Sequence, residues 1–351
     1  MENEDRELRE MLIRAATPRT FRPRVDPMDI LHDYTFRQRF RLSRRGFQFV
    51  LGLIGDDLCP RTVRSQSLTS AQKLGIFLET IGSSSLQRTT AITLGCSQST
   101  VSRVIEEVSN VFWTRRTEFI SWPTDEERAA MSRRFFSACR IPKVVGAIDG
   151  THVKIIAPRE SEDSYVNRKG YHSINVGAIA DLDLKFLWIS VAYPGSAHDS
   201  RVFRSSALYR DLSAGRKQGV LLGDSAYRLE NFLLKPYLGD TMTEPQRCFT
   251  EALQRGRVCV ERAFGALKRQ FLSLHTELQY DPESAAKIIN AAVCMRNLCI
   301  ATSEDEFTEE TAAGYEDAGD ERYDSRSDGA EREDGSMRES IVRRYFQGLQ
   351  Q

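Results

Sequence analysis

Apolar side chains in the first 140 residues recur at intervals of three and four, the spacing that places them on one face of an α-helix. Ser43, Thr69 and Thr124 precede such runs and are residue types that cap helix N-termini. The pattern predicts helices within 26–58 and at 71–81, 86–94, 99–113 and 125–139. Residues 1–25 are polar and Arg-rich and lack this period, so we expect a flexible arm there.

A short helix, a turn containing Gly95 and a second amphipathic helix follow one another between residues 86 and 113. This order is typical of a helix-turn-helix, whose second helix enters the major groove of DNA. Four polar residues of types that reach base edges and phosphates would face outward there: Gln98, Ser99, Ser102 and Arg103. The alternative is a helical bundle without a role in DNA binding.

From Val144 the pattern changes to β-branched runs and alternation with a period of two. We expect strands at 144–148, 152–157, 173–180, 186–192 and 219–223. Helices are expected at 199–211, 257–273 and 283–301. Strands, then a helix, a strand and further helices are the order of an RNase H-like α/β domain, a mixed sheet flanked by helices.

Charge is distributed unevenly although the formal net charge is zero. Residues 303–340 contain 15 acidic and 4 basic residues, whereas residues 1–302 contain 43 Lys and Arg against 34 Asp and Glu. A basic body suits a polyanion such as DNA, and the alternative is an ordinary solvated surface. The acidic stretch is poor in large apolar side chains, so we expect disorder there, followed by a short helix at 341–349.

These changes of pattern divide the chain into four expected parts. They are a flexible arm (1–25), a helical, helix-turn-helix-like region (26–140), an RNase H-like nuclease domain (141–302) and an acidic, largely disordered tail (303–351). No run approaches the roughly 18 apolar residues of a membrane span, and the charged N-terminus predicts no secretory signal. The seven cysteines form no CxxC pair, so we expect reduced thiols in an intracellular protein, without a zinc site or a disulfide framework.

Two aspartates follow apolar runs in the predicted α/β domain. Asp149 comes after 144–148, and Asp224 comes after 220–223. A carboxylate at the end of a buried strand is costly to desolvate unless it is paired or binds a cation. Glu261 lies at the edge of the apolar face of a predicted helix and could lean towards both aspartates. These three residues are therefore candidates for one catalytic metal site at the rim of the sheet.

Converging carboxylates suit a nuclease because Mg²⁺ and similar hard cations prefer oxygen ligands. Two such ions, roughly 3.5–4 Å apart, can activate the attacking oxygen and stabilise the leaving oxygen in phosphodiester displacement. With 49 acidic residues, however, many other triples could be drawn from the chain.

Five segments of the chain resemble the Harbinger-type (PIF/Harbinger) transposases, a DDE family with domesticated members. They are GAIDGTHV (146–153), YVNRKGYHS (165–173), PGSAHDS (194–200), LLGDSAY (221–227) and VERAFG (260–265). The resemblance extends over about residues 25–301. It implies that Asp149, Asp224 and Glu261 form the catalytic set and bind Mg²⁺ or Mn²⁺, and that Asp199 is a fourth metal ligand. The alternative for Asp199 is a plain helix N-cap.

Other residues near these motifs have two interpretations. Arg168 and Lys169 lie in a loop that ends at glycine, so they either grip a phosphate or are solvated. His152 and His172 are interpreted as core or surface residues in preference to proton-transfer groups. Residues 293–298 depart from the family's usual "LHN" by having Met295 and Arg296, which leaves the role of the family histidine unassigned.

The function expected from these observations is a transposase-derived hydrolase, a metal-dependent nuclease acting on DNA. The alternative is a catalytically silent domesticated transposase that binds DNA or protein. The resemblance implies a Myb-like DNA-binding partner protein. The chain shows no compelling Lys/Arg cluster for autonomous nuclear import, so partner-assisted entry and a location in both nucleus and cytoplasm are expected.

Overall fold

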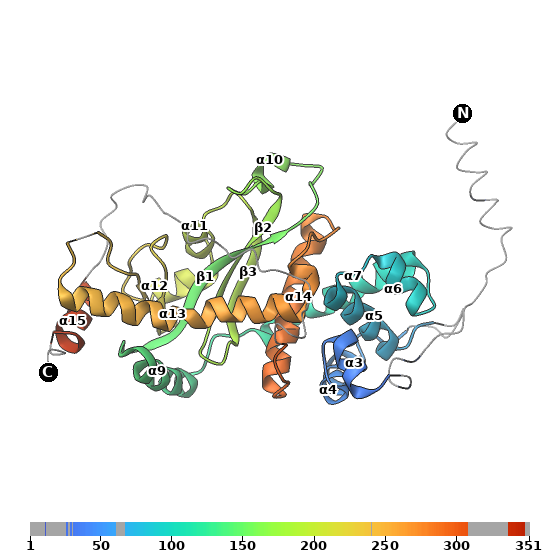
Figure 1. Ribbon diagram of the computed structural model, residues 1–351, viewed down its shortest axis with the longest axis horizontal. Coiled ribbons are helices and arrows are strands. Elements are labelled where there is room, and N and C mark those ends of the chain that lie inside the picture. Colours follow the sequence, from blue (N-terminus) through green and yellow to red (C-terminus); the bar gives the residue numbers. More distant parts are fainter. Residues whose placement is uncertain are drawn as a thin grey trace.

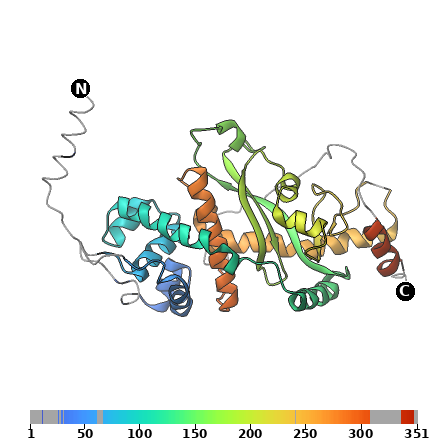
Figure 2. The same ribbon diagram turned by 180° about the vertical axis from the view of Figure 1, so that it is seen from behind.

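A computed structural model of the chain describes residues 31–60, 67–239, 241–307 and 336–347, together with the single residues 11, 26 and 29. The expected flexible arm and most of the acidic tail lie outside the described residues. A helical region lies at one end of the molecule and the sheet domain at the other (Figures 1 and 2). None of the described helices combines the length and the apolar character that a membrane crossing requires.

The helical region confirms the helices expected from the apolar period. Its elements are α3 (Asp33–Phe40), α4 (Arg44–Ile54), α5 (Ser70–Ser83), α6 (Gln87–Thr93), α7 (Gln98–Thr114), α8 (Arg116–Phe119) and α9 (Asp125–Cys139). Thr69 and Thr124 each form a reciprocal capping box with the residue three positions on, Gln72 and Glu127. Helix α7 buries Val101, Val104, Ile105, Val108 and Phe112 against its neighbours.

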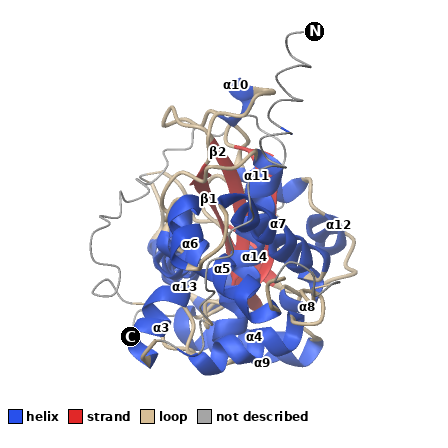
Figure 3. Ribbon diagram, turned by 90° about the vertical axis from the view of Figure 1, so that its right-hand side faces the viewer, coloured by secondary structure: helices blue, strands red, loops and turns tan. Residues whose placement is uncertain are grey.

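The sheet has five strands in the order β3-β2-β1-β4-β5. They are β1 (Val144–Lys154), β2 (Ser173–Ala180), β3 (Phe186–Pro194), β4 (Val220–Leu222) and β5 (Leu233–Leu234). Strands β1, β2 and β3 pair antiparallel, whereas β4 pairs parallel with both β1 and β5. The sheet is thus mixed and flanked by helices (Figure 3), which confirms the expected α/β class.

Helices cover both faces of this sheet. The remaining helices are α10 (Glu162–Tyr165), α11 (Asp199–Arg204), α12 (Ala207–Ser213), α13 (Glu244–Gln270), the 3₁₀ turn η1 (Leu272–Leu274), α14 (Pro282–Ala301) and α15 (Ser336–Tyr345). Side chains of α13 and α14 share the larger core with β2 residues such as Val176 and Ala178. Phe203 of α11 and Leu208 and Leu212 of α12 pack with Ile179 in a second core on the opposite face.

The prediction of two strands at 144–148 and 152–157 was wrong, because β1 runs without interruption from Val144 to Lys154. Asp149 therefore lies inside a strand, opposite Ala178 of β2. Asp149 and Gly150 interrupt the run of apolar residues, but backbone pairing with β2 continues through both of them. The strand at 219–223 is confirmed as the shorter β4, and β5 was not predicted.

Three helix boundaries also differ from the expectation. The helix expected at 199–211 is divided into α11 and α12, because Ser206 caps a new helix by accepting a hydrogen bond from the backbone N–H of Tyr209. The helix expected at 257–273 begins at Glu244. The helix expected at 341–349 is α15, which begins at Ser336.

Candidate active site

The early end of β4 creates the opening in which the acids lie. Ala147 of β1 pairs with Leu222, the last residue of β4. Among the described strands, only β2 continues to pair with β1 from Ile148 onward. Asp149 lies two residues beyond Ala147, and Asp224 lies two residues beyond Leu222. Because β1 and β4 are parallel, both carboxylates lie in the gap beyond the last residue of β4. The acids are therefore at the rim of the sheet because β4 ends there, and not because β1 ends.

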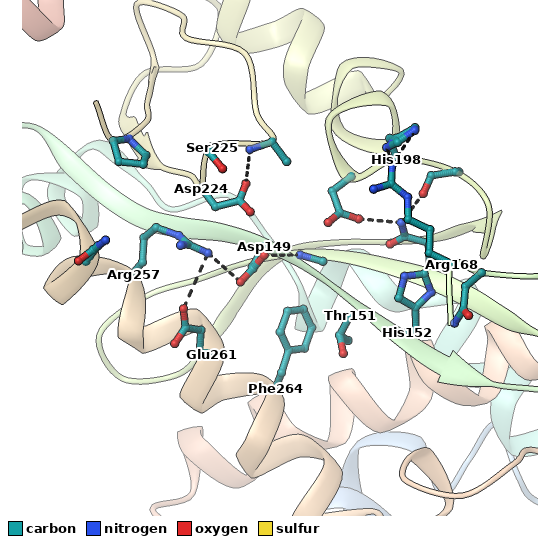
Figure 4. Close-up of a pocket in the computed structure, with 18 of the residues that line it drawn as sticks. Asp149, Thr151, His152, Arg168, His198, Asp224, Ser225, Arg257, Glu261 and Phe264 are labelled. Carbon is teal, nitrogen blue, oxygen red and sulfur yellow. Dashed lines mark hydrogen bonds and ion pairs between the residues drawn. The ribbon is translucent and has the colours of Figure 1, made fainter. Parts of the chain in front are cut away.

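The predicted site residues line one pocket of about 790 Å³. Its wall includes every acid singled out from the sequence and both basic loop residues: Asp149, Asp199, Asp224, Glu261, Arg168 and Lys169. They come from β1, the N-terminus of α11, the loop after β4, the middle of α13 and the loop after α10. Figure 4 shows Asp149, Asp224, Glu261 and Arg168 on separate elements around the pocket. Gln98, Ser99, Ser102 and Arg103 do not line this pocket and are exposed on α7.

Asp149 is largely buried, and Arg257 of α13 compensates its charge. An Arg257 Nη2 proton is donated to Asp149 Oδ2 over 2.9 Å, and the same nitrogen lies 3.8 Å from Glu261 Oε1. The side chains of Asp149 and Arg257 are 19% and 14% exposed, whereas that of Glu261 is 57% exposed. Arg257 thus lies between two of the three predicted catalytic carboxylates (Figure 4).

Negative charge accumulates around Asp149. Burial, with smaller contributions from the carboxylates of Asp224 and Asp199, raises the pKa of Asp149 to about 7 against the opposing effect of Arg257. The buried phenol of Tyr227 responds to the same field, because burial and the charges of Asp199, Asp149 and Asp224 raise its pKa well above the usual value. The carboxylates of Asp149, Asp199 and Asp224 therefore lie close enough to interact electrostatically.

Asp199 is fixed by the face of the sheet that α11 covers. Asn175 of β2 donates a hydrogen bond from Nδ2 to Asp199 Oδ1 over 2.7 Å. Gly150 lies directly beneath, since a Cβ at that position would be 2.4 Å from the Asp199 carboxyl carbon. Asp199 is the first residue of α11, and no side-chain cap bond was found at this helix's N-cap, His198. The contact with Asn175 turns the carboxylate towards the pocket and weakens the N-cap interpretation.

The donor set fits a hard divalent cation in chemistry. Carboxylate oxygens predominate, and the buried Asn175 Oδ1 has no hydrogen-bond partner among the described residues. Repulsion between Asp149, Asp224 and Asp199 is what a bound cation would relieve. In the part of the chain that the structure describes, however, no three His, Cys, Asp or Glu side chains are grouped closely enough to hold a metal, and Arg257 contacts Asp149 instead.

The two histidines differ in their surroundings. His152 lines the pocket and its Nδ1 is 3.0 Å from Ser173 Oγ. His172 is not among the lining residues, and its Nε2 is 3.1 Å from Glu162 Oε1. Arg168 is exposed, with Nη2 at 3.0 Å from Nδ1 of His198.

The departure at Met295 and Arg296 does not reach the pocket. Met295 is fully buried in α14, and Arg296 pairs with Glu306 over 3.1 Å.

Sequence reasoning missed four polar residues that shape the site: Arg257, Lys268, Asn175 and Tyr237. Lys268 donates from Nζ to Thr151 Oγ1 over 2.8 Å. Arg257 and Lys268 lie four residues before and seven residues after Glu261, which is helical spacing on one face and could have been noticed. Asn175 and Tyr237 gave no comparable local signal, since their contacts are with distant segments.

Comparisons with known proteins agree with the motifs. Residues 148–297 match the family described as the DDE superfamily endonuclease. Over 303 residues the chain is 29% identical to "Putative nuclease HARBI1" of Bos taurus, and this match covers 85% of this chain and 86% of that protein. The Xenopus laevis protein of the same name is 29% identical over 293 residues, covering 82% and 84% of the two chains.

A plant protein is more distant. "Protein ALP1-like" of Arabidopsis thaliana is 23% identical over 293 residues, covering 78% of this chain and 72% of that protein. No solved structure matches the chain. The resemblance carried by the five motifs is confirmed: the chain is similar over most of its length to nucleases derived from Harbinger transposases, and residues 148–297 match the DDE superfamily endonuclease.

Proposed function

We propose that the chain is a divalent-metal-dependent nuclease that cleaves phosphodiester bonds of DNA, and that its α/β domain is RNase H-like. The carrying observation is that Asp149, Asp199, Asp224 and Glu261, from four separate segments, line one pocket at the end of β4. The antiparallel order of β1, β2 and β3 with parallel β4 and β5 supports the assignment of the fold.

The acids would hold Mg²⁺ or Mn²⁺, and the bound metal would activate the attacking oxygen and stabilise the leaving oxygen. The backbone of Asp149 is held in place, because it belongs to β1 and is paired with Ala178 of β2. Asn175 orients Asp199, and Ala226 N–H orients Asp224 by donating to its Oδ1 over 2.9 Å. Arg168 and Lys169, which line the same pocket, would bind phosphates of the DNA.

The proposal is tested by DNA nicking with Mg²⁺ or Mn²⁺. Asp149→Ala, Asp224→Ala and Glu261→Ala are each expected to lower the rate about a thousandfold, which corresponds to roughly 4 kcal/mol of transition-state stabilisation. Glu251→Ala is the matched control for Glu261→Ala, because Glu251 is an exposed acid on the same helix that does not line the pocket. Cleavage that survives all three pocket substitutions would reject this mechanism.

A second candidate is a DNA- or protein-binding factor without catalysis. The observation favouring it is the ion pair of Arg257 with Asp149, in which an internal cation already compensates the buried acid. Calorimetric titration with Mn²⁺ separates the candidates. Binding that is lost in Asp149→Ala favours the nuclease, and no carboxylate-dependent binding favours the silent factor.

We further propose that α6 and α7 form a helix-turn-helix that contacts DNA together with a Myb-like partner protein, and that the protein occurs in nucleus and cytoplasm. The exposure of Gln98, Ser99, Ser102 and Arg103 along α7 supports the DNA contact. The positive φ of Gly95, 69°, supports the tight turn between the two helices. Co-purification of a Myb-like protein and fractionation of cells test the remaining two parts.

A further inference from the structure

One wall of the pocket is a loop far from the acids in the chain. Residues 235–239 follow β5, and four of them line the pocket: Pro236, Tyr237, Leu238 and Gly239. Leu238 is 62% exposed at this wall. The loop's position therefore decides the shape of the pocket on that side.

Helix α15 is anchored beside this loop. Ile341 and Val342 of the helix and Phe346, directly after it, are 5%, 5% and 4% exposed and belong to the main hydrophobic core. The ring of Phe346 meets that of Phe249 of α13, with centroids 5.7 Å apart. Figures 1 and 2 both show α15 at the end of α13 that lies away from the helical region. These apolar contacts pack the helix against α13.

Two polar residues of α15 instead contact the loop. The guanidinium carbon of Arg338 lies 3.9 Å from the centroid of the Tyr237 ring, and Arg338 Nη1 donates to the carbonyl oxygens of Lys235 and Pro236, each over 3.4 Å. The Tyr237 hydroxyl donates to Glu339 Oε1 over 2.6 Å. The guanidinium contact is a cation–π interaction.

Tyr237 links this contact to the rest of the domain. Its ring meets Phe249 with centroids 5.8 Å apart, and its backbone N–H donates to Thr250 Oγ1 over 3.2 Å. Burial and the hydrogen bond to Glu339 raise the pKa of Tyr237 to about 12, so the phenol remains a donor at neutral pH. The side chain is therefore held by α13 and by α15 at once.

We propose that α15 is a positioning element of the candidate active site, in which Arg338 and Glu339 hold Tyr237 and thereby fix the pocket wall formed by residues 235–239. This inference rests on the proposed nuclease function for its catalytic consequence. Its structural part is independent, because the contacts of Arg338 and Glu339 with Tyr237 involve none of the predicted metal ligands.

Full-length Arg338→Met, which removes the cation but keeps an apolar stem, tests the proposal. Arg343→Met on the exposed face of α15 is the matched control. Hydrogen exchange of residues 235–239 is expected to be about tenfold faster in Arg338→Met than in the wild-type chain and unchanged in Arg343→Met. DNA cleavage by Arg338→Met is expected to show a kcat about tenfold lower with KM unchanged, because the wall is displaced while most DNA contacts remain.

Arg338→Lys serves as the conservative variant, since it keeps a cation over the ring but loses the planar fork. It is expected to recover part of both the exchange protection and the kcat. Unchanged exchange in Arg338→Met would overturn the proposal, and this measurement does not require that the wild-type chain cleave DNA. Faster exchange combined with wild-type cleavage kinetics would also overturn it. If the wild-type chain does not cleave DNA, the proposed function fails, and the exchange measurement still decides whether Arg338 holds the loop.

Discussion

The outer face of α7 and the pocket beside β1 both carry polar residues that the motifs suggested for contact with DNA, but they differ in burial. Ser99, Ser102 and Arg103 are exposed, so they lie in water at no cost and their presence alone says little about function. Asp149 and Arg257 are mostly buried and held by each other. Buried charge requires compensation, so a specific function is a better supported explanation for the pocket than for α7.

Removal of the internal cation should produce the largest change in stability. Arg257→Met leaves Asp149 buried beside Asp224 and Asp199 without its partner. Because Asp149 can relieve part of the penalty by binding a proton, we expect a loss of about 2 kcal/mol in unfolding free energy without metal. Thermal melts with and without Mn²⁺ measure it, and Mn²⁺ should restore part of the loss.

Arg262→Met is the control for this substitution, since Arg262 is an exposed residue on the same helix and does not line the pocket. It should melt like the wild-type chain. An Arg257→Met variant that is destabilised but insensitive to Mn²⁺ would argue against a cation site at Asp149.

The glycine beneath Asp199 should be the next most sensitive position. A Cβ in Gly150→Ala would lie 2.4 Å from the Asp199 carboxyl carbon and must move that carboxylate away from Asn175. We expect a stability loss of about 1 kcal/mol, because the carboxylate can move aside, and a marked loss of cleavage. Gly177→Ala, opposite Gly150 in the pair of β1 and β2, meets Val202 at 3.2 Å and should have a smaller effect.

A double-mutant cycle identifies the cause of that loss. In an Asp199→Ala background the added methyl group of Gly150→Ala no longer meets a carboxylate, so the cost of Gly150→Ala should shrink. Strictly additive losses in unfolding free energy would contradict the packing explanation.

The outer face of α7 should respond through DNA binding and leave the fold unchanged. Arg103→Ala is expected to weaken binding by about 1 kcal/mol, to reduce the salt slope of log K by about 1, and to change stability by less than about 0.5 kcal/mol. Glu106→Ala, an exposed acid three residues on, is the control in the same gel-shift series. Wild-type affinity and slope in Arg103→Ala would favour a helical bundle without a DNA role.

The smallest expected effect lies inside the helical region. Gly52→Ala in α4 adds a Cβ with nothing within 4 Å, so it should stabilise the chain by about 0.5–1 kcal/mol and leave cleavage unchanged. Gly46→Ala in the same helix would meet Glu304 Oε1 at 2.4 Å and should not stabilise. Denaturant unfolding compares the two, and equal stabilisation would show that Glu304 moves freely.

Local signals explain what the sequence could predict. Helix α9 has the expected bounds, because Thr124 and Glu127 form a capping box at its start and Arg140 adopts the left-handed conformation at its end. Asp149, Asp224 and Glu261 could be predicted because each lies within a short motif of the sequence. Their assignment as metal ligands stays a prediction, and Arg257 is the cation that contacts Asp149.

Long-range pairing explains what was missed. The continuity of β1 through Asp149 and Gly150 depends on β2, and the two-residue β5 is too short to show a period. The ion pair of Asp149 with Arg257 joins residues 108 positions apart, and the hydrogen bond of Tyr237 with Glu339 joins residues 102 positions apart. No local pattern contains such contacts, since only the folded sheet and helices create them.

The wide separation of Asp149 from its partners on α13 has a consequence during protein synthesis. A ribosome releases β1 long before Arg257 and Glu261 emerge, so the growing chain carries Asp149 without the cation that compensates it. Because α13 must dock on β1 to complete the charge balance, this part of the domain can mature only after translation has passed residue 261.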